Sequence, residues 1–372
     1  ANGYYDGTCN KVIEILSDGF VADGITFLNV NEESKFAGTL YVNKTGVTTT
    51  VKNSVFEYGR ISLSGADETN DVIIDNVKLK YAGAYNEDYY AFYNSNNTPV
   101  NAVNLVVTAT PKCLDYATNS MGEMLGMLPA GATVQLMPGN YNLVPGKETV
   151  SGQTGWYMPI TKSVTLQGID ENGNVITDAS QTQANIYSTY YTANGAWATQ
   201  NLITVWADDV VIEGLTIMNK VDPNKAIEVV SGTDPITFTI RNCKLAPIDS
   251  SLLENGVVKD SNGSVVYDET YAEYGASLYF SGSYGNITAY VQDNLFDYSS
   301  VSFGSVTGGS YTVTGNEFKG AKNWNHDPDY YYSSIGYQGV WTNPPGTSFG
   351  ESVVTIKNNK FIDSGKINFS QV

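Results

Sequence analysis

A short pattern of apolar and polar positions recurs along this chain. Each copy has an apolar residue, one polar residue, then Asn, Asp or Gly, and an apolar or aromatic residue three positions further on. The clearest copies lie at 51–56, 74–79, 240–245, 291–296, 313–318 and 356–361. The segments 21–27, 166–168 and 212–217 fit the same frame. This internal repeat therefore predicts the fold class.

The middle position of the pattern predicts a sharp bend in the chain. It is occupied only by residues that tolerate a positive φ: Gly24, Asn53, Asn76, Gly168, Gly214, Asn242, Asp293, Gly315 and Asn358. Uninterrupted neighbours are 22 to 29 residues apart, a period typical of one coil of a β-solenoid. Each coil has a further apolar strand upstream, before a turn. Examples lie at 40–43, 61–64, 202–206, 226–230, 277–281, 301–304 and 340–343. We therefore expect a right-handed parallel β-helix of about ten coils, each with three strands.

Two interior columns follow if the coils stack in register. Asn294, Asn316 and Asn359 should align as an inward amide ladder, because stacked amides hydrogen-bond from coil to coil. Phe296, Phe318 and Phe361 should form an aromatic stack in the core. Cys243 occupies the ladder position and should be a buried, inert thiol.

The repeat resembles the pectate-lyase-like superfamily of right-handed parallel β-helices, and the resemblance covers most of the chain. It implies that loops after the third strand wall the outer face of the first strand, where such proteins commonly bind polysaccharide. It also implies what a catalytic member would carry: a Lys or Arg base with calcium in lyases, or clustered aspartates with Gly-His-Gly and Arg-Ile-Lys motifs in hydrolases. Neither hydrolase motif occurs here, so the chain resembles a divergent member without the catalytic motifs.

One segment departs from the repeat. Residues 111–128 have helical spacing, and 129–143 follow as two short strands split by Pro-Gly. In the superfamily such a helix commonly caps the start of a β-helix. We therefore predict two tandem β-helical segments, a partial one at 1–100 and a capped one at 101–372.

Composition limits the kinds of molecule that this protein is expected to bind. The 38 acidic residues outweigh the 20 basic ones, for a net charge of −18, which argues against nucleic acid and anionic membrane surfaces. No run of about eighteen apolar residues occurs, so we expect no membrane insertion. The three cysteines lack metal-site spacing. Abundant Gly and Tyr with few charges favour an extracellular or cell-surface protein.

Period-2 alternation in the first strands predicts an outward column of Trp206, Glu228, Tyr279, Ser302 and Trp341. Long aromatic-rich loops at 80–99, 170–201, 246–275 and 319–339 should flank it. The last of these supplies Trp324, His326, Tyr330, Tyr331 and Tyr332. Tyrosines of this kind either contact sugar rings or pack the loops onto the barrel. We take these loop residues, with Trp206, Glu228, Tyr279 and Trp341, as the candidate ligand-binding set.

Catalytic signals are weak. Glu228 is the one candidate acid or base in the column. Asp208-Asp209 suggests calcium or acid/base work but falls in a turn, where aspartates favour turn geometry. His326, the only histidine, lies in a loop, and Arg241 lies on a different strand from the expected groove. Three readings stay open: a non-catalytic β-helix that binds polysaccharide or a cell-surface glycan, a divergent polysaccharide lyase or glycoside hydrolase, and an adhesin stalk. No cofactor is expected, with calcium possible.

Overall fold

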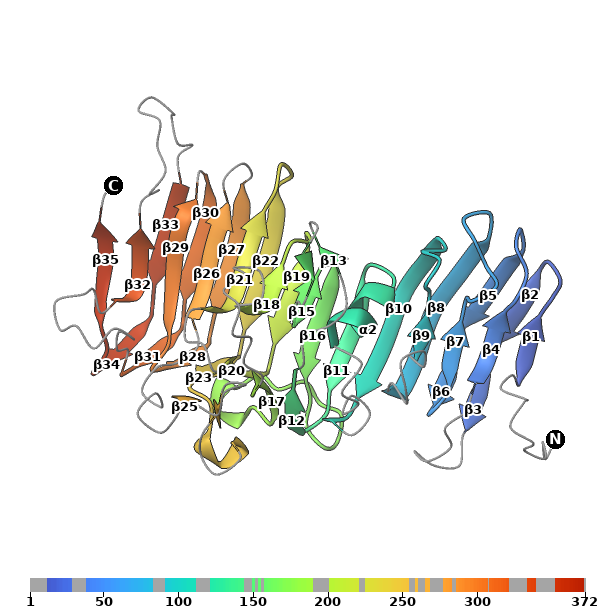
Figure 1. Ribbon diagram of the computed structural model, residues 1–372, viewed down its shortest axis with the longest axis horizontal. Helices are drawn as coiled ribbons and strands as arrows, with labels where there is room; N and C mark the ends of the chain where they lie inside the picture. Colours follow the sequence, from blue (N-terminus) through green and yellow to red (C-terminus); the bar gives the residue numbers. More distant parts are fainter. Residues whose placement is uncertain are drawn as a thin grey trace. The chain divides into compact units, whose positions relative to one another are not determined.

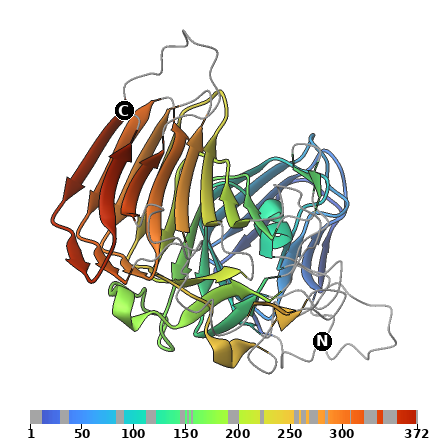
Figure 2. The ribbon, with the colours of Figure 1, turned by 60° about the vertical axis from the view of Figure 1, so that its left-hand side comes forward.

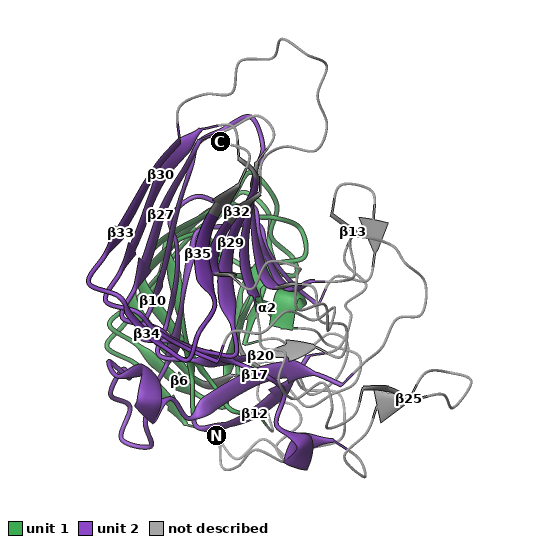
Figure 3. Ribbon diagram, turned by 90° about the vertical axis from the view of Figure 1, so that its left-hand side faces the viewer, with its two compact units in different colours: residues 1–137 green, residues 138–372 purple. Residues whose placement is uncertain are grey.

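The computed structural model describes most of the strands and a smaller part of the loops. The described residues are 12–28, 38–82, 91–111, 121–143, 149–150, 153–154, 157–189, 201–220, 225–253, 258–259, 265–267, 277–282, 286–306, 308–320, 333–338 and 352–370. The chain divides into two compact units, residues 1–137 and 138–372, shown in green and purple in Figure 3.

Unit 1 is built from parallel strands that recur in the order expected of a solenoid. Its first-strand sheet pairs β1 (Ile13–Ile15), β4 (Gly38–Val42), β7 (Arg60–Ser62) and β9 (Phe92–Tyr93). Its second-strand sheet pairs β2 (Phe20–Asp23), β5 (Thr48–Lys52), β8 (Asp71–Ala82), β10 (Val100–Ala109) and β11 (Ala132–Leu136). The third strands β3 (Thr26–Leu28) and β6 (Val55–Glu57) pair with each other, and β6 continues onto the second half of β8. Every one of these pairings is parallel.

Unit 2 repeats the three-sheet arrangement (Figures 1 and 2). The first-strand sheet holds β15 (Met158–Ile160), β18 (Asn201–Val205), β21 (Lys225–Ser231), β26 (Ser277–Gly282), β29 (Ser300–Val306), β32 (Ser333–Gln338) and β35 (Lys366–Ser370). The second-strand sheet holds β16 (Val164–Gly168), β19 (Val210–Glu213), β22 (Ile236–Arg241), β27 (Ile287–Gln292), β30 (Gly309–Thr314) and β33 (Ser352–Lys357). The third-strand sheet holds β12 (Gly139–Asn142), β17 (Ala184–Ser188), β20 (Thr216–Lys220), β23 (Lys244–Ala246), β28 (Leu295–Asp297), β31 (Glu317–Lys319) and β34 (Lys360–Ile362). The long parallel sheets confirm a parallel β-helix.

Smaller elements lie outside these sheets. Two antiparallel pairs join β13 (Thr149–Val150) to β14 (Gln153–Thr154) and β24 (Val258–Lys259) to β25 (Val265–Tyr267). Single 3₁₀ turns occur at η1 (Ala179–Gln181) and η3 (Ser250–Leu252). In each turn the preceding aspartate, Asp178 or Asp249, caps the first N–H groups, as helix starts require.

The predicted bend is present in all but one of the expected coils. Gly24, Asn53, Asn76, Gly214, Asn242, Asp293, Gly315 and Asn358 have φ between 49° and 71°. Gly168 was wrongly assigned: it ends β16 and is not among the positive-φ residues. Glycine is needed there for close approach, because a methyl group would lie 2.0 Å from the carbonyl oxygen of Gly214.

Both predicted columns are present, although Phe361 in the aromatic one is 39% exposed and not buried as expected. The Phe318 ring stacks on Phe296 with 4.6 Å between centroids and on Phe361 with 5.1 Å. In the ladder, the side-chain Nδ2 of Asn294 donates to Asn316 Oδ1 at 3.0 Å, and that of Asn316 donates to Asn359 Oδ1 at 2.9 Å. Cys243 heads the ladder, because its backbone N–H donates to Asn294 Oδ1 at 2.9 Å. Asn294 and Asn316 are buried but satisfied, which removes the cost of placing them in an apolar interior. Asn359 is half-buried.

The segment that departs from the repeat contains helix α2 (Met121–Met127), which buries Met121, Met124 and Leu125. The two strands predicted after it are β11 and β12. Strand β10 pairs in parallel with both β8 and β11, and the compact units divide after Met137. Independent folding on either side of Asn101 stays a prediction. Among the described residues, no helix is long and apolar enough to cross a membrane.

We expect Phe318→Asp to prevent folding. Phe318 is fully buried, and an unpaired carboxylate in its place would cost several kcal/mol. Thr312→Asp is the matched control, because it puts the same charge on the half-exposed outer face of β30. Circular dichroism and thermal melting give the comparison. A soluble Phe318→Asp protein with a cooperative melt would contradict the interior stack.

Candidate functional site

The outward column of the first-strand sheet in unit 2 is partly as predicted. Glu228 pairs in register with Tyr279, and Tyr279 with Ser302. Thr204 lies beside Glu228 on the other side, and Gly336 follows Ser302. The placement of Trp206 in this column was therefore wrong, and Gly336 takes the position predicted for Trp341. Trp206 directly follows β18 and is half-buried, and the strand that pairs with β29 is 333–338, not 340–343.

Alternation explains why these residues point outward. Ile203, Ile227, Leu278 and Val301 directly precede them and are fully buried in the core. Thr204, Glu228, Tyr279 and Ser302 therefore lie on the other face of the sheet.

The Glu228 carboxylate is held from both neighbouring strands. Its Oε2 accepts a hydrogen bond from the side-chain Nδ2 of Asn201 on β18, and its Oε1 accepts one from the Ser281 hydroxyl on β26 at 2.9 Å. Asn201 is only 3% exposed, so the carboxylate is fixed at the edge of a buried polar patch. Two donors from opposite sides give Glu228 one preferred orientation, which is a property of binding and catalytic carboxylates alike.

Tyr279 lies along the sheet beside this carboxylate. A methyl group on Gly304 would lie 1.7 Å from the Tyr279 hydroxyl oxygen, so the phenol extends over β29. Burial raises the pKa of Tyr279, and the negative charge of Glu228 raises it further. The phenol therefore stays protonated at neutral pH and can donate a hydrogen bond.

Thr204 adds a polar atom to the same column. Its side chain is 2% exposed, and its Oγ1 has no hydrogen-bond partner among the described residues. Buried hydroxyls are normally satisfied by protein, water or ligand. Asn201, Thr204, Glu228, Tyr279 and Ser281 thus form one polar cluster around the Glu228 carboxylate, which we call the Glu228 cluster.

The loop residues predicted to wall this face lie outside the described residues. These are Trp324, His326, Tyr330, Tyr331 and Tyr332, and Trp341 of the predicted column lies outside the described residues as well. Their roles stay predictions. Sequence reasoning missed Asn201, Thr204 and Ser281, whose small polar side chains are ordinary in strands and carry no motif.

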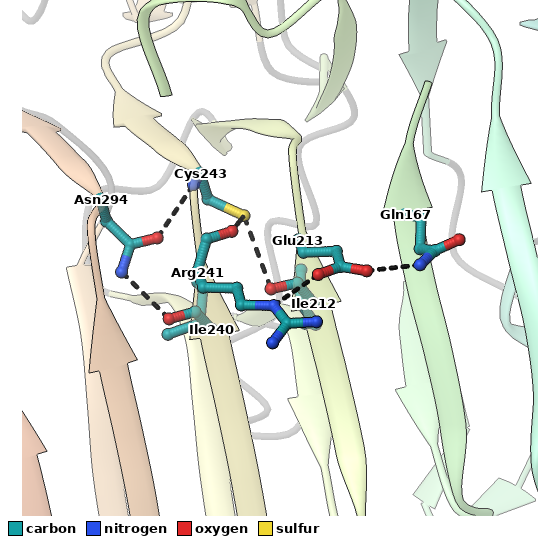
Figure 4. A network of polar contacts seen from close by, with 7 residues as sticks. All are labelled: Gln167, Ile212, Glu213, Ile240, Arg241, Cys243 and Asn294. Carbon is teal, nitrogen blue, oxygen red and sulfur yellow. Dashed lines mark hydrogen bonds and ion pairs between the residues drawn. The ribbon is translucent and has the colours of Figure 1, made fainter. Parts of the chain in front are cut away.

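A second polar network occupies the second-strand sheet and serves the fold. Glu213 on β19 accepts hydrogen bonds from Gln167 on β16 and from Arg241 on β22 (Figure 4). The three side chains lie side by side because their residues pair in register. Glu213 is buried and ion-paired, which makes it a coil-to-coil tie. Arg241 thus lies away from the Glu228 cluster, as expected.

Asp208 and Asp209 form a turn, as the sequence favoured. Asp208 Oδ1 accepts hydrogen bonds from the backbone N–H of Thr237 at 2.6 Å and of Asp209 at 2.9 Å, and Asp209 has a φ of 52°. Asp18 of unit 1 makes the same pair of contacts, with Thr48 and Gly19. Through these hydrogen bonds each aspartate links its own turn to the next coil.

Metal binding finds no support in the described strands. Within the ranges listed above, no group of three or more His, Cys, Asp or Glu side chains is arranged to hold a metal ion. The possibility of calcium at this protein stays a prediction.

Comparison with known proteins gives no relative for this chain: no family model, curated protein or solved structure matches it. Its function must therefore be argued from the fold and the residues themselves.

The Asp208 turn should make stability depend on pH. The hydrogen bond from the Thr237 backbone N–H lowers the pKa of Asp208 below its usual value. The stability it contributes is present above the unfolded-state value of about 3.9 and is lost as pH falls through the lower folded-state pKa. We expect Asp208→Asn to melt below wild type at pH 7, with the gap closing in acid. Asp234→Asn, an exposed aspartate in the following turn, is the control. A gap that persists unchanged at low pH would contradict this role.

Cys243 should resist alkylation in the folded protein. Burial raises the pKa of its thiol to about 12, so at pH 8 only about one thiol in ten thousand is the reactive thiolate. In a protein with Cys9 and Cys113 replaced by serine, iodoacetamide should label Cys243 only after denaturation. Mass spectrometry would detect labelling. Labelling of the native protein at the rate of a free thiol would contradict the buried position.

Proposed function

We propose that the outer face of the unit 2 first-strand sheet binds a polysaccharide or cell-surface glycan without chemical turnover. In this proposal the chain is a divergent, extracellular member of the pectate-lyase-like β-helices. The observation that carries it is the Glu228 carboxylate, oriented by Asn201 and Ser281 from the two adjacent strands. A fixed carboxylate accepts hydrogen bonds from sugar hydroxyls without the entropy cost of ordering a free side chain.

The other members of the Glu228 cluster suit a sugar. Tyr279 offers a ring that can pack against the apolar C–H face of a pyranose and a hydroxyl that can donate. Thr204 offers a buried hydroxyl with no hydrogen-bond partner among the described residues. Donors and acceptors next to an aromatic ring are the usual make-up of a polar ligand site.

Charge favours a neutral glycan. Glu228 is the only Asp or Glu in the seven strands of this sheet, and the chain carries a net charge of −18. Both would repel a polyanion such as a polyuronate. A neutral glycan would not meet this electrostatic repulsion.

The same residues argue against turnover. Glycoside hydrolysis commonly uses two carboxyl groups about 5 to 9.5 Å apart, and the strands of this sheet supply one. The divergent hydrolase or lyase is therefore the rival proposal, and it requires further catalytic groups from outside these strands.

We expect Glu228→Gln to weaken binding of a neutral glycan about tenfold, because a hydrogen bond to a charged group contributes roughly 1.5–3 kcal/mol. A glycan array would identify the ligand, and titration calorimetry would measure its affinity. Glu317→Gln is the matched control, since Glu317 lies on the third-strand sheet and pairs with Lys319 and Lys360. Equal affinity of the Glu228→Gln protein and wild type would contradict the proposal.

Assays for released reducing ends and unsaturated products separate the rival. A hydrolase or lyase that uses Glu228 would turn over glycan and lose orders of magnitude in rate with glutamine at this position. A binding protein would show no product with either variant.

A further inference from the structure

An arginine close to two tyrosine rings is a second feature, on the first-strand sheet of unit 1. Tyr41 on β4 pairs in register with Ser62 on β7, and Ser62 with Tyr93 on β9. Their neighbours Leu40, Ile61 and Phe92 are buried in the core, so the paired residues face outward. The column therefore reads Tyr, Ser, Tyr across three adjacent strands.

Arg60 lies over this column. It precedes Ser62 by two residues and shares its face of β7. Its guanidinium carbon is 4.9 Å from the centroid of the Tyr41 ring and 5.9 Å from that of Tyr93. One of its terminal nitrogens donates to the Tyr41 hydroxyl. The two rings and this hydrogen bond help to hold the guanidinium in place.

A guanidinium that stacks through its faces directs its N–H donors within its own plane. That geometry matches the two oxygens of a carboxylate and is the reason arginine recognises such groups bidentately. Arg60 is the only cationic residue in the four strands of this sheet.

Ser62 provides an independent sign of a ligand. Its side chain is completely buried although it faces outward, and its Oγ has no hydrogen-bond partner among the described residues. It lies between the two tyrosines that flank the guanidinium. A buried donor without an acceptor is costly, and an oxygen atom bound beside Arg60 would satisfy it.

We propose that Tyr41, Arg60, Ser62 and Tyr93 form a binding site for a carboxylate group carried by a small ligand, either a sugar acid or an acidic peptide side chain. The site is separate from the Glu228 cluster, which lies on another sheet and in the other unit, and its charge preference is opposite. In a chain with a net charge of −18, an anion binds only where a local cation is already oriented. The stacked Arg60 meets that condition.

Two probes distinguish the source of the carboxylate. Glucuronate represents a sugar acid and N-acetylaspartate amide an acidic side chain; glucose and N-acetylasparagine amide are their neutral counterparts. We expect one acid to bind the full chain, measured by saturation-transfer NMR and calorimetry, and its neutral counterpart to fail. Arg60→Lys, which keeps the charge but loses the planar fork, should weaken this binding about tenfold, and Ser62→Ala by about threefold.

Controls separate the site from the rest of the molecule. Arg241→Lys changes the only other arginine, which is committed to Glu213, and Glu228→Gln removes the proposed glycan contact. Both should bind the acid as wild type does, whether or not a neutral glycan binds at Glu228. Should Arg60→Lys fail to melt cooperatively, Ser62→Ala decides, because it removes one oxygen atom only. Binding of neither acid, or binding unaffected by Arg60→Lys and Ser62→Ala, would overturn the proposal and leave the stack a purely structural contact.

Discussion

The coil-to-coil pairing of parallel strands is the constraint on which the rest of this structure depends. It holds because a single residue in most coils, between the second and third strands, turns the chain through a positive φ, from Gly24 to Asn358. The bend returns the third strand to the same place in every coil, so equivalent residues fall into columns. Once columns exist, the aromatic stack at Phe318 and the amide ladder at Asn316 follow directly, since each side chain meets its own kind one coil away.

The same constraint arranges polar side chains on the outside. Asp23 meets Lys52 at 3.3 Å, and Glu317 meets Lys360 at 3.0 Å, each across adjacent strands. Such exposed pairs are screened by water and contribute little to stability, so they affect the surface more than the fold. Asp208 shows the tighter form, in which a carboxylate of one turn accepts a backbone N–H of the next coil. The solenoid thus carries much of its polar bonding between neighbouring coils.

Both proposed sites use columns in the first-strand sheets, with opposite charge. In unit 2, donors on the two adjacent strands orient Glu228. In unit 1, rings on the two adjacent strands orient Arg60. In each case a charged side chain on a central strand is fixed by both neighbours, and a nearby hydroxyl, Thr204 or Ser62, has no hydrogen-bond partner in the described part of the chain. A stacked sheet can produce such sites without loops, because its strands already lie about 4.8 Å apart.

The sequence by itself determined the fold class, the bends and the interior columns, because bend residues and core residues must each satisfy a local requirement that is visible in the chain. Positive φ restricts the bend to Gly, Asn and Asp, and alternation fixes which face each strand residue takes. Only the tertiary structure decided register. A shift of two residues keeps every side chain on its face, so alternation could not distinguish Trp206 from Thr204 as a member of the Glu228 column. Strand pairing alone decided that 333–338, and not 340–343, lies beside β29. Alternation also could not identify Asn201, Ser281 and Ser62 as important. Their importance comes from the residues beside them in neighbouring coils. Those neighbours are determined by pairing between segments far apart in the chain.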